Sequence, residues 1–126
     1  MVTWILWALI LAMLAWMGFN YLRIRRAAKI VDNEEFEALI RTGQLIDLRD
    51  PAEFHRKHIL GARNIPSSQL KTSLAALRKD KPVLLYENQR AQRVTNAALY
   101  LKKQGFSEIY ILSYGLDSWI GKVKTS

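Results

Sequence analysis

Two groups of polar residues in this chain of 126 residues have types and spacings suited to chemistry. Asp47, Arg49 and Glu53 follow one short apolar run, and the loop from Glu87 to Arg93 follows another. The chain contains no cysteine, which excludes disulfides, cysteine-type zinc sites and any reaction that proceeds through a thiolate. Because its only histidines are His55 and His58, we predict no histidine-rich metal site. We also predict no bound cofactor.

The second group is a continuous polar loop, which consists of Glu87, Asn88, Gln89, Arg90, Ala91, Gln92 and Arg93. A carboxylate nucleophile at Glu87 is one interpretation, but a lone glutamate without a matched acid or a metal cluster gives it little support. Arg90 and Arg93 are expected to be solvated charges, unless a small anion or a protein partner binds at this loop. We therefore treat the loop as a candidate binding site with no predicted catalytic residue.

The first group is better explained by structure than by catalysis. We expect Asp47, Arg49 and Glu53 to form a local frame of ion pairs and hydrogen bonds at the end of a strand. Asp50 followed by Pro51 is typical of a turn that starts a helix. No further role is needed for these residues.

Four other residues are also predicted to be structural. His58 is expected to be hydrogen-bonded and to hold the loop that precedes Gly61. Gly61 is expected to permit close backbone packing. Gly115 is predicted to open a last short helix, and Trp119 within that helix is predicted to be a core or covering aromatic.

The apolar pattern predicts alternating strands and helices. Asp32 and Glu35 can form a capping box for a helix over residues 34–41, with Gly43 suited to a left-handed exit. Ser67 or Ser68 is expected to cap a helix that carries Leu70, Leu74 and Leu77 on one face. The other expected elements are strands over 44–48, 62–65, 82–86 and 109–112, a helical turn from Pro51, and a helix over 93–104. Because the run 82–86 is apolar throughout, it is typical of a strand buried on both faces of a parallel sheet.

Three stretches of the sequence carry a family resemblance. They are Asp47–Phe54 (DLRDPAEF), His58–Pro66 (HILGARNIP) and Leu112–Trp119 (LSYGLDSW). In this order and spacing they resemble the rhodanese-like domain, with Tyr114 at a position where that family usually has glycine. The resemblance covers residues 30 to 121. It implies a three-layer α/β domain with a central, mostly parallel sheet and the scaffold of a sulfurtransferase.

In the family that the chain resembles, a cysteine opens the loop after the central strand and faces backbone N–H groups at a helix N-terminus. Counting back from Gly105 places Asn88 at the cysteine position and Arg93 at the basic position of that loop. Counting forward from Tyr86 places Glu87 at the cysteine position instead. Neither side chain carries sulfur, so we predict no transfer of sulfur and expect a binding or regulatory module. Two alternatives remain open: a sulfurtransferase, as the resemblance implies, or a membrane-tethered scaffold for a partner protein.

The replaced cysteine also suggests how the loop is stabilised. The Glu87 carboxylate or the Asn88 amide oxygen is expected to fill the nest of N–H groups that would otherwise bind an anion. Arg93 or Arg90 would be paired with it. A filled nest would compete with external anions for the same N–H groups.

The first 22 residues predict a membrane anchor. The run from Val2 to Phe19 is interrupted only by Thr3 and Gly18. About 20 helical residues at ~1.5 Å each span a hydrocarbon layer of ~30 Å. A cleaved signal is disfavoured, because its basic residues would precede the apolar run and here they follow it. We thus expect a transmembrane helix over 1–22, a basic linker over 23–29 and the rhodanese-like domain over 30–126.

The basic linker predicts orientation and one partner. Arg23, Arg25, Arg26 and Lys29 directly follow the apolar helix, which favours a cytoplasmic domain and an N-terminus outside. The same residues are expected to contact lipid headgroups. Without these four, 15 of the 19 basic residues remain against 11 acidic ones, and no basic stripe interleaved with aromatic residues is present. We therefore predict no nucleic-acid binding.

Overall fold

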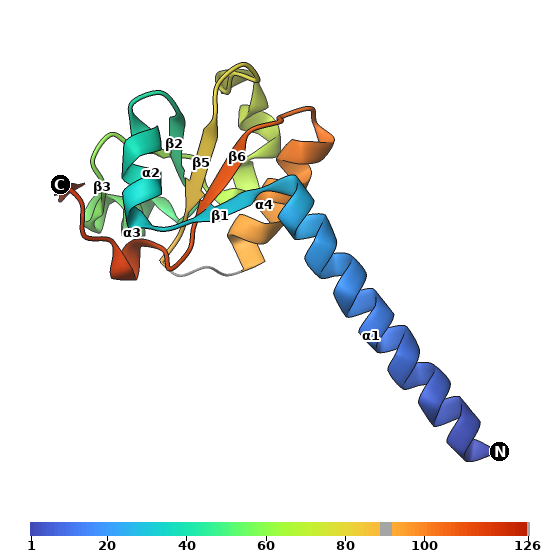
Figure 1. Cartoon of the computed structure of the whole chain (residues 1–126). Coiled ribbons are helices and arrows are strands. Elements are labelled where there is room, and N and C mark those ends of the chain that lie inside the picture. The colour runs from blue at the N-terminus through green and yellow to red at the C-terminus, as the bar shows by residue number, and fades with distance from the viewer. Residues whose placement is uncertain (89–91, 126) are drawn as a thin grey trace.

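The structure is a computed structural model that describes residues 1–88 and 92–125, with the side chains of 23–27 left out. Its centre is a five-stranded sheet in the order β1-β6-β5-β2-β4 (Figure 1). The strands are β1 (Lys29–Val31), β2 (Gln44–Asp47), β4 (Arg63–Asn64), β5 (Val83–Tyr86) and β6 (Ile109–Leu112). Every described pairing in this sheet is parallel, so the expected α/β architecture with a central parallel sheet is confirmed.

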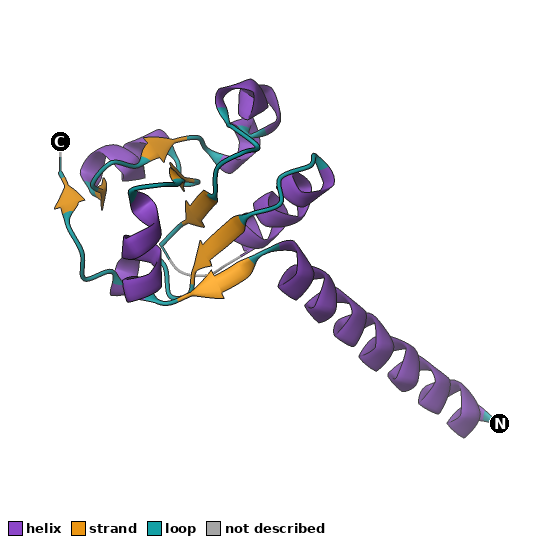
Figure 2. Ribbon diagram, turned by 45° about the horizontal axis from the view of Figure 1, so that its top comes forward, coloured by secondary structure: helices purple, strands orange, loops and turns teal. Residues whose placement is uncertain are grey.

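Helices cover both faces of the sheet and make it the middle of three layers (Figure 2). On one face lie α2 (Asn33–Ile40) and the 3-10 helix η3 (Leu116–Ser118). On the other lie α4 (Gln92–Lys103) and the 3-10 helices η1 (Ser67–Gln69) and η2 (Lys71–Ala76). Successive residues of β5 enter the two cores alternately, and all four are buried. A strand buried on both faces has to be apolar throughout, as this one is.

The start of α2 follows the predicted capping pattern. The Asp32 side chain accepts a hydrogen bond of 2.9 Å from the backbone N–H of Glu35. Gly43 corrects a prediction, because it does not have a positive φ. A Cβ at Gly43 would lie 2.1 Å from Leu84 Cδ1, so this glycine is required by close packing rather than by a left-handed exit.

Two helices predicted from the sequence have a different form. The segment after Pro66 forms η1 and η2, and no side chain caps them, so the prediction of a capped α-helix there is wrong. The last helix, η3, ends at Ser118, and Trp119 directly follows it. Trp119 is nonetheless buried and packs edge-on against Phe36 at 5.8 Å, which makes it a core aromatic.

Three short strands were missed in the sequence. One is β1; the others are β3 (His58–Ile59) and β7 (Val123–Lys124), which form a small antiparallel sheet beside α3 (Pro51–Arg56). With two or three residues each, they are too short for an alternating pattern to appear.

The N-terminal helix α1 (Val2–Ala27) projects from the domain (Figure 1). Its stretch Val2–Leu22 is long and apolar enough to cross a membrane. Residues 23–27 continue the helix and β1 begins at Lys29, so the segment predicted as a linker has regular structure. Between the two lies Ala28, which is buried in the domain core.

Candidate functional site

The two polar groups seen in the sequence lie side by side because β2 and β5 are neighbours. Asp47 is paired with Tyr86 in the register of these parallel strands. The segments that follow both strands therefore leave the same edge of the sheet, which is the usual place for a site in an α/β fold. The third contributor is the turn after β6, which carries Gly115.

A buried ion pair forms the floor of the site. The fully buried Asp47 carboxylate accepts hydrogen bonds from Arg49 Nε at 3.0 Å and from Arg49 Nη2 at 2.8 Å. Arg49 Nη2 also donates to the carbonyl of Lys57, at the end of α3. Burial opposes the charge on Arg49, but the hydrogen bonds and charge of Asp47 outweigh it and raise the pKa of Arg49. The pair remains ionised and holds β2 and α3 together.

Tyr86 completes the floor of the site. It was not identified from the sequence as a residue of the site. Its hydroxyl accepts a 3.1 Å hydrogen bond from the backbone N–H of Ile59 and is hydrogen-bonded to the Asp47 side chain. Burial, followed by the charge of Asp47, raises the pKa of Tyr86 far above its usual value. A tyrosine that ends an otherwise aliphatic strand was the available signal, since a buried hydroxyl needs a partner.

Asn88 connects the loop after β5 to that floor. Its Oδ1 accepts a 3.0 Å hydrogen bond from Arg49 Nη1, and its Nδ2 donates at 2.8 Å to Glu53 Oε2. Glu53 thus takes part in the predicted frame through Asn88. Asn88 carries both a donor and an acceptor, which is why it can bridge a guanidinium and a carboxylate.

Glu87 lies at the first turn of α4. Its side chain is largely buried, and Oε2 accepts a 2.9 Å hydrogen bond from the backbone N–H of Val94. The N–H of Arg93 is a second backbone donor to the same carboxylate. Burial raises the pKa of Glu87, and the hydrogen bonds from Val94 and Arg93 only partly oppose this. The carboxylate occupies backbone donors at a helix N-terminus, which attract negative charge.

The turn after β6 packs closely against the backbone carbonyls of Glu87 and Asn88. The carbonyl of Glu87 accepts from Leu116 N at 2.8 Å, and that of Asn88 accepts from Asp117 N at 2.9 Å. Gly115 has a φ of +70°, and a Cβ there would lie 2.5 Å from either carbonyl oxygen. Glycine is therefore required for two independent reasons, conformation and space.

The remaining predicted positions have structural surroundings. His58 is buried, its Nδ1 lies 2.7 Å from the carbonyl of Phe54, and its ring stacks on Phe54 at 3.8 Å. Gly61 has a φ of +91° and open space around it, so conformation and not close packing requires glycine there. Asp50 precedes α3, with Pro51 in its first turn, but its side chain makes no capping hydrogen bond.

The rest of the loop is only partly described. Gln89, Arg90 and Ala91 lie outside the described residues, as do the side chains of the predicted headgroup contacts Arg23, Arg25 and Arg26. Gln92 and Arg93 are exposed on α4, and Gln92 donates to Asn96. In the described part of the chain, no three His, Asp or Glu side chains are arranged to hold a metal ion.

A cavity of about 210 Å³ opens beside Asn88. It lies between α3, the loop after β5 and η3, and is lined by Arg49, Glu53, Arg56, Lys57, Asn88, Leu116 and Asp117. Three of these side chains are basic and two are acidic, so the cavity offers both hydrogen-bond donors and acceptors to a small polar group. Arg49 and Glu53 are already engaged by protein partners, which leaves Arg56 and Lys57 as the basic groups at its rim.

Comparisons with known proteins agree with the resemblance. The rhodanese-like domain family matches residues 32–122. The uncharacterised protein YqhL of Bacillus subtilis is 48% identical over 113 residues, covering 90% of this chain and 89% of that protein. The thiosulfate sulfurtransferase GlpE of Stutzerimonas stutzeri is 36% identical over 94 residues, covering 72% of this chain and 84% of the relative.

A solved structure shows the same fold. The rhodanese-related protein of Thermoplasma volcanium superposes with a TM-score of 0.70 at 24% identity, covering 78% of this chain and 99% of that one.

Proposed function

The chain belongs to the rhodanese-like domain family, and we propose that it is a membrane-anchored member whose loop after β5 binds a ligand without transferring sulfur. The observation that carries this proposal is the side chain at the α4 N-terminus. A carboxylate, that of Glu87, accepts hydrogen bonds from backbone donors there, and the 126 residues contain no cysteine. A carboxylate cannot carry a sulfane sulfur atom, so the scaffold is left with its binding surface.

The proposed ligand site has two parts. The first is the set of N–H groups of α4, which the Glu87 carboxylate fills as an internal anion. The second is the cavity beside Asn88, whose rim residues Arg56 and Lys57 suit a small anion or an acidic group on a partner protein. We propose that ligands enter the cavity, because the N–H groups are already occupied.

The anchor is the other half of the proposal. The stretch Val2–Leu22 of α1 is long and apolar enough to span a bilayer, and basic residues occur only after this stretch. That charge pattern favours an N-terminus outside and a cytoplasmic domain. Insertion and orientation are tested together by protease protection of the full chain in inverted membrane vesicles.

Cyanolysis of thiosulfate by the full chain in detergent tests the loss of sulfur transfer. We expect thiocyanate formation equal to that of buffer. The alternative, a sulfurtransferase, is favoured by the relative named thiosulfate sulfurtransferase and would be established by turnover that depends on the loop. Introducing Glu87→Cys and Asn88→Cys separately asks which position replaces the family's cysteine, with restored turnover as the readout.

Calorimetry with sulfate and thiosulfate tests the internal anion. Glu87→Ala frees the N–H groups of Arg93 and Val94, so it should bind these anions more tightly than the unaltered chain. Glu87→Gln is the matched control, because its amide oxygen still accepts from Val94 and should keep binding weak. Equal, tight binding by the unaltered chain and Glu87→Ala that persists when Arg56 and Lys57 are both changed to alanine would contradict the internal anion, since it would not come from the cavity.

A protein partner is tested by crosslinking from the cavity rim. A photoreactive side chain at the exposed Arg56 should capture a partner that is displaced by a change at Lys57. The same probe at the exposed Lys81, on the far side of the domain, is the control.

A further inference from the structure

The two helices that cover opposite faces of the sheet carry opposite charge. α2 has three acidic and no basic side chains, whereas α4 has three basic and no acidic ones. All six are exposed: Glu34, Glu35 and Glu37 on α2, and Arg93, Lys102 and Lys103 on α4. The other exposed residues of α4 are Gln92 and Asn96, which are hydrogen-bonded to each other, and Thr95, Leu99 and Tyr100 are half-buried. Glu35 lies 3.7 Å from Lys29, which begins β1, and the exposed surfaces of the two helices are thus opposite in charge.

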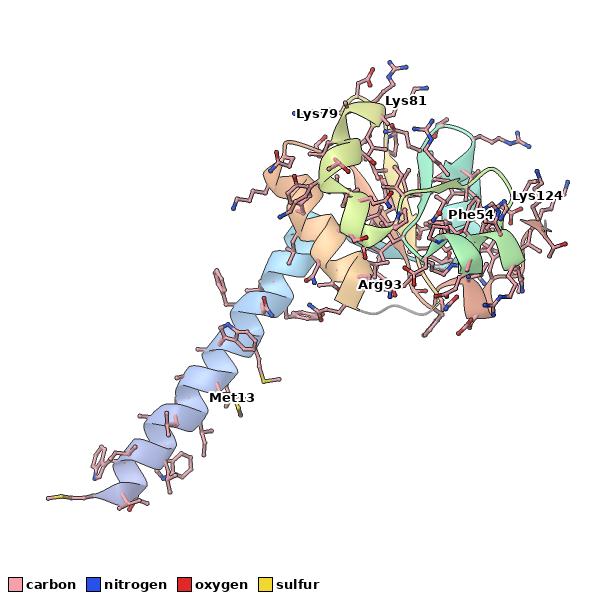
Figure 3. The ribbon with its side chains drawn as sticks, turned by 180° about the vertical axis from the view of Figure 1, so that it is seen from behind. Met13, Phe54, Lys79, Lys81, Arg93 and Lys124 are labelled. Carbon is pink, nitrogen blue, oxygen red and sulfur yellow. The ribbon has the colours of Figure 1, made fainter. Side chains whose placement is uncertain are left out.

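The apolar helix α1 joins the domain on the basic side. α1 contacts α4, and Figures 1 and 3 show α4 beside the point at which α1 leaves the domain. In Figure 3, Arg93 lies close to the level at which α1 leaves the domain, whereas Lys124 lies on the far side of the domain. The acidic helix α2 covers the other face of the sheet.

The connection between α1 and the domain is too short for the domain to move far from the membrane or to turn α4 away from it. The apolar stretch ends at Leu22, and Ala28 is already buried in the core. The five residues between them are helical and span about 8 Å at ~1.5 Å per residue. A headgroup layer is about 5–7 Å thick on each side of a bilayer, so a domain held this close rests against it.

We propose that the exposed face of α4 lies on an anionic lipid surface, with Arg93, Lys102 and Lys103 against the headgroups and α2 turned toward water. This inference rests on the proposed insertion of α1 in a membrane. It extends the predicted lipid contacts from the segment after α1 to a helix of the folded domain. It also places the first turn of α4, and with it the Glu87 carboxylate, at the boundary between lipid and water.

The test uses the full chain in nanodiscs and exploits its lack of cysteine, which lets one introduced thiol carry a fluorophore. Asn96→Cys reports on the exposed face of α4, and Glu37→Cys on α2 is the matched control. A quencher attached to lipid headgroups should quench the fluorophore at 96 strongly in discs containing phosphatidylglycerol and much less in pure phosphatidylcholine. The fluorophore at 37 should be quenched little in both.

Charge reversal tests whether the basic side chains of α4 hold this helix on the lipid surface. Lys102→Glu with Lys103→Glu should lower the ratio of surface-bound to detached domains by roughly fivefold or more per side chain. Lys122→Glu with Lys124→Glu changes the charge equally at β7, on the side of the domain away from α4, and should leave quenching at 96 unchanged. Equal quenching at 96 and 37, equal quenching of the fluorophore at 96 in both lipids, or equal effects of the two double variants would each overturn the inference.

A third label separates this inference from the proposed anchor. A fluorophore at Leu11→Cys, in the middle of α1, should be reached only by a quencher placed on lipid acyl chains. If it is reached by a water-soluble quencher instead, α1 is not inserted and the anchor itself is wrong. If α1 is inserted but position 96 is not quenched, only the inference about α4 is refuted.

Discussion

Replacement of Gly115 by alanine should destabilise the domain far more than the same change at another glycine of positive φ. Gly115 combines φ +70° with ψ −167°, a region that only glycine enters readily, which costs another residue about 1–3 kcal/mol. The new Cβ would also lie 2.5 Å from the carbonyl oxygens of Glu87 and Asn88. Relief of that contact breaks the hydrogen bonds to Leu116 and Asp117, worth about 1 kcal/mol each. The sum is a loss of about 3–5 kcal/mol.

Gly61→Ala is the matched control for this prediction. Gly61 has φ +91°, but a Cβ there meets nothing within 4 Å, so only the backbone cost of about 1–2 kcal/mol applies. Thermal unfolding of the full chain in detergent, followed by circular dichroism, measures both. At roughly 4–8 °C per kcal/mol, Gly115→Ala should lower Tm by about 15 °C or more and Gly61→Ala by about 5–15 °C. Equal losses of Tm in the two variants would show that the turn after β6 does not pack closely against the loop after β5.

Three further changes test the polar groups at the site. Glu87→Gln should be more stable than the unaltered chain at pH 7, because the raised pKa of Glu87 means that its charged form is disfavoured in the folded state. This advantage should be lost as the pH falls toward 4.5 and Glu87 becomes protonated. Urea unfolding at the two pH values measures the difference. Arg49→Ala should cost about 3–5 kcal/mol in urea unfolding, since it leaves the buried Asp47 carboxylate without its positively charged partner, and a loss below 1 kcal/mol would contradict this. Tyr86→Phe should cost about 1–3 kcal/mol by leaving the Ile59 N–H unpaired, and it should speed amide exchange at Ile59.

Four of the five strands of the central sheet could be predicted, and β2, β5 and β6 among them because their apolar runs are bounded by clear signals. The four-residue strand β5 is buried on both faces, so its composition alone identifies it. The cap of α2 was equally legible, since Asp32 and Glu35 have the spacing that a capping box requires. β1 was not, because three residues that follow a long helix directly carry no periodicity of their own.

The site could be predicted as two polar groups but not as one network. Sequence order separates Arg49 from Asn88 by 39 residues, and only the adjacency of β2 and β5 brings them within 3.0 Å. The role of Gly115 depended in the same way on a contact with the loop after β5, made through space. The sequence left open whether Glu87 or Asn88 fills the N–H groups of α4; the structure places the Glu87 carboxylate there and directs Asn88 toward Arg49 and Glu53.

The continuous path from α1 through Ala28 into β1 has a mechanical consequence. A helix that spans a bilayer tilts when the hydrocarbon thickness differs from its own length. Here there is no slack at the junction to absorb such a tilt, and β1 is the outer strand of the sheet. A thinner or thicker bilayer would thus rotate the whole domain relative to the membrane surface. Lipid composition would then change the orientation of the loop after β5.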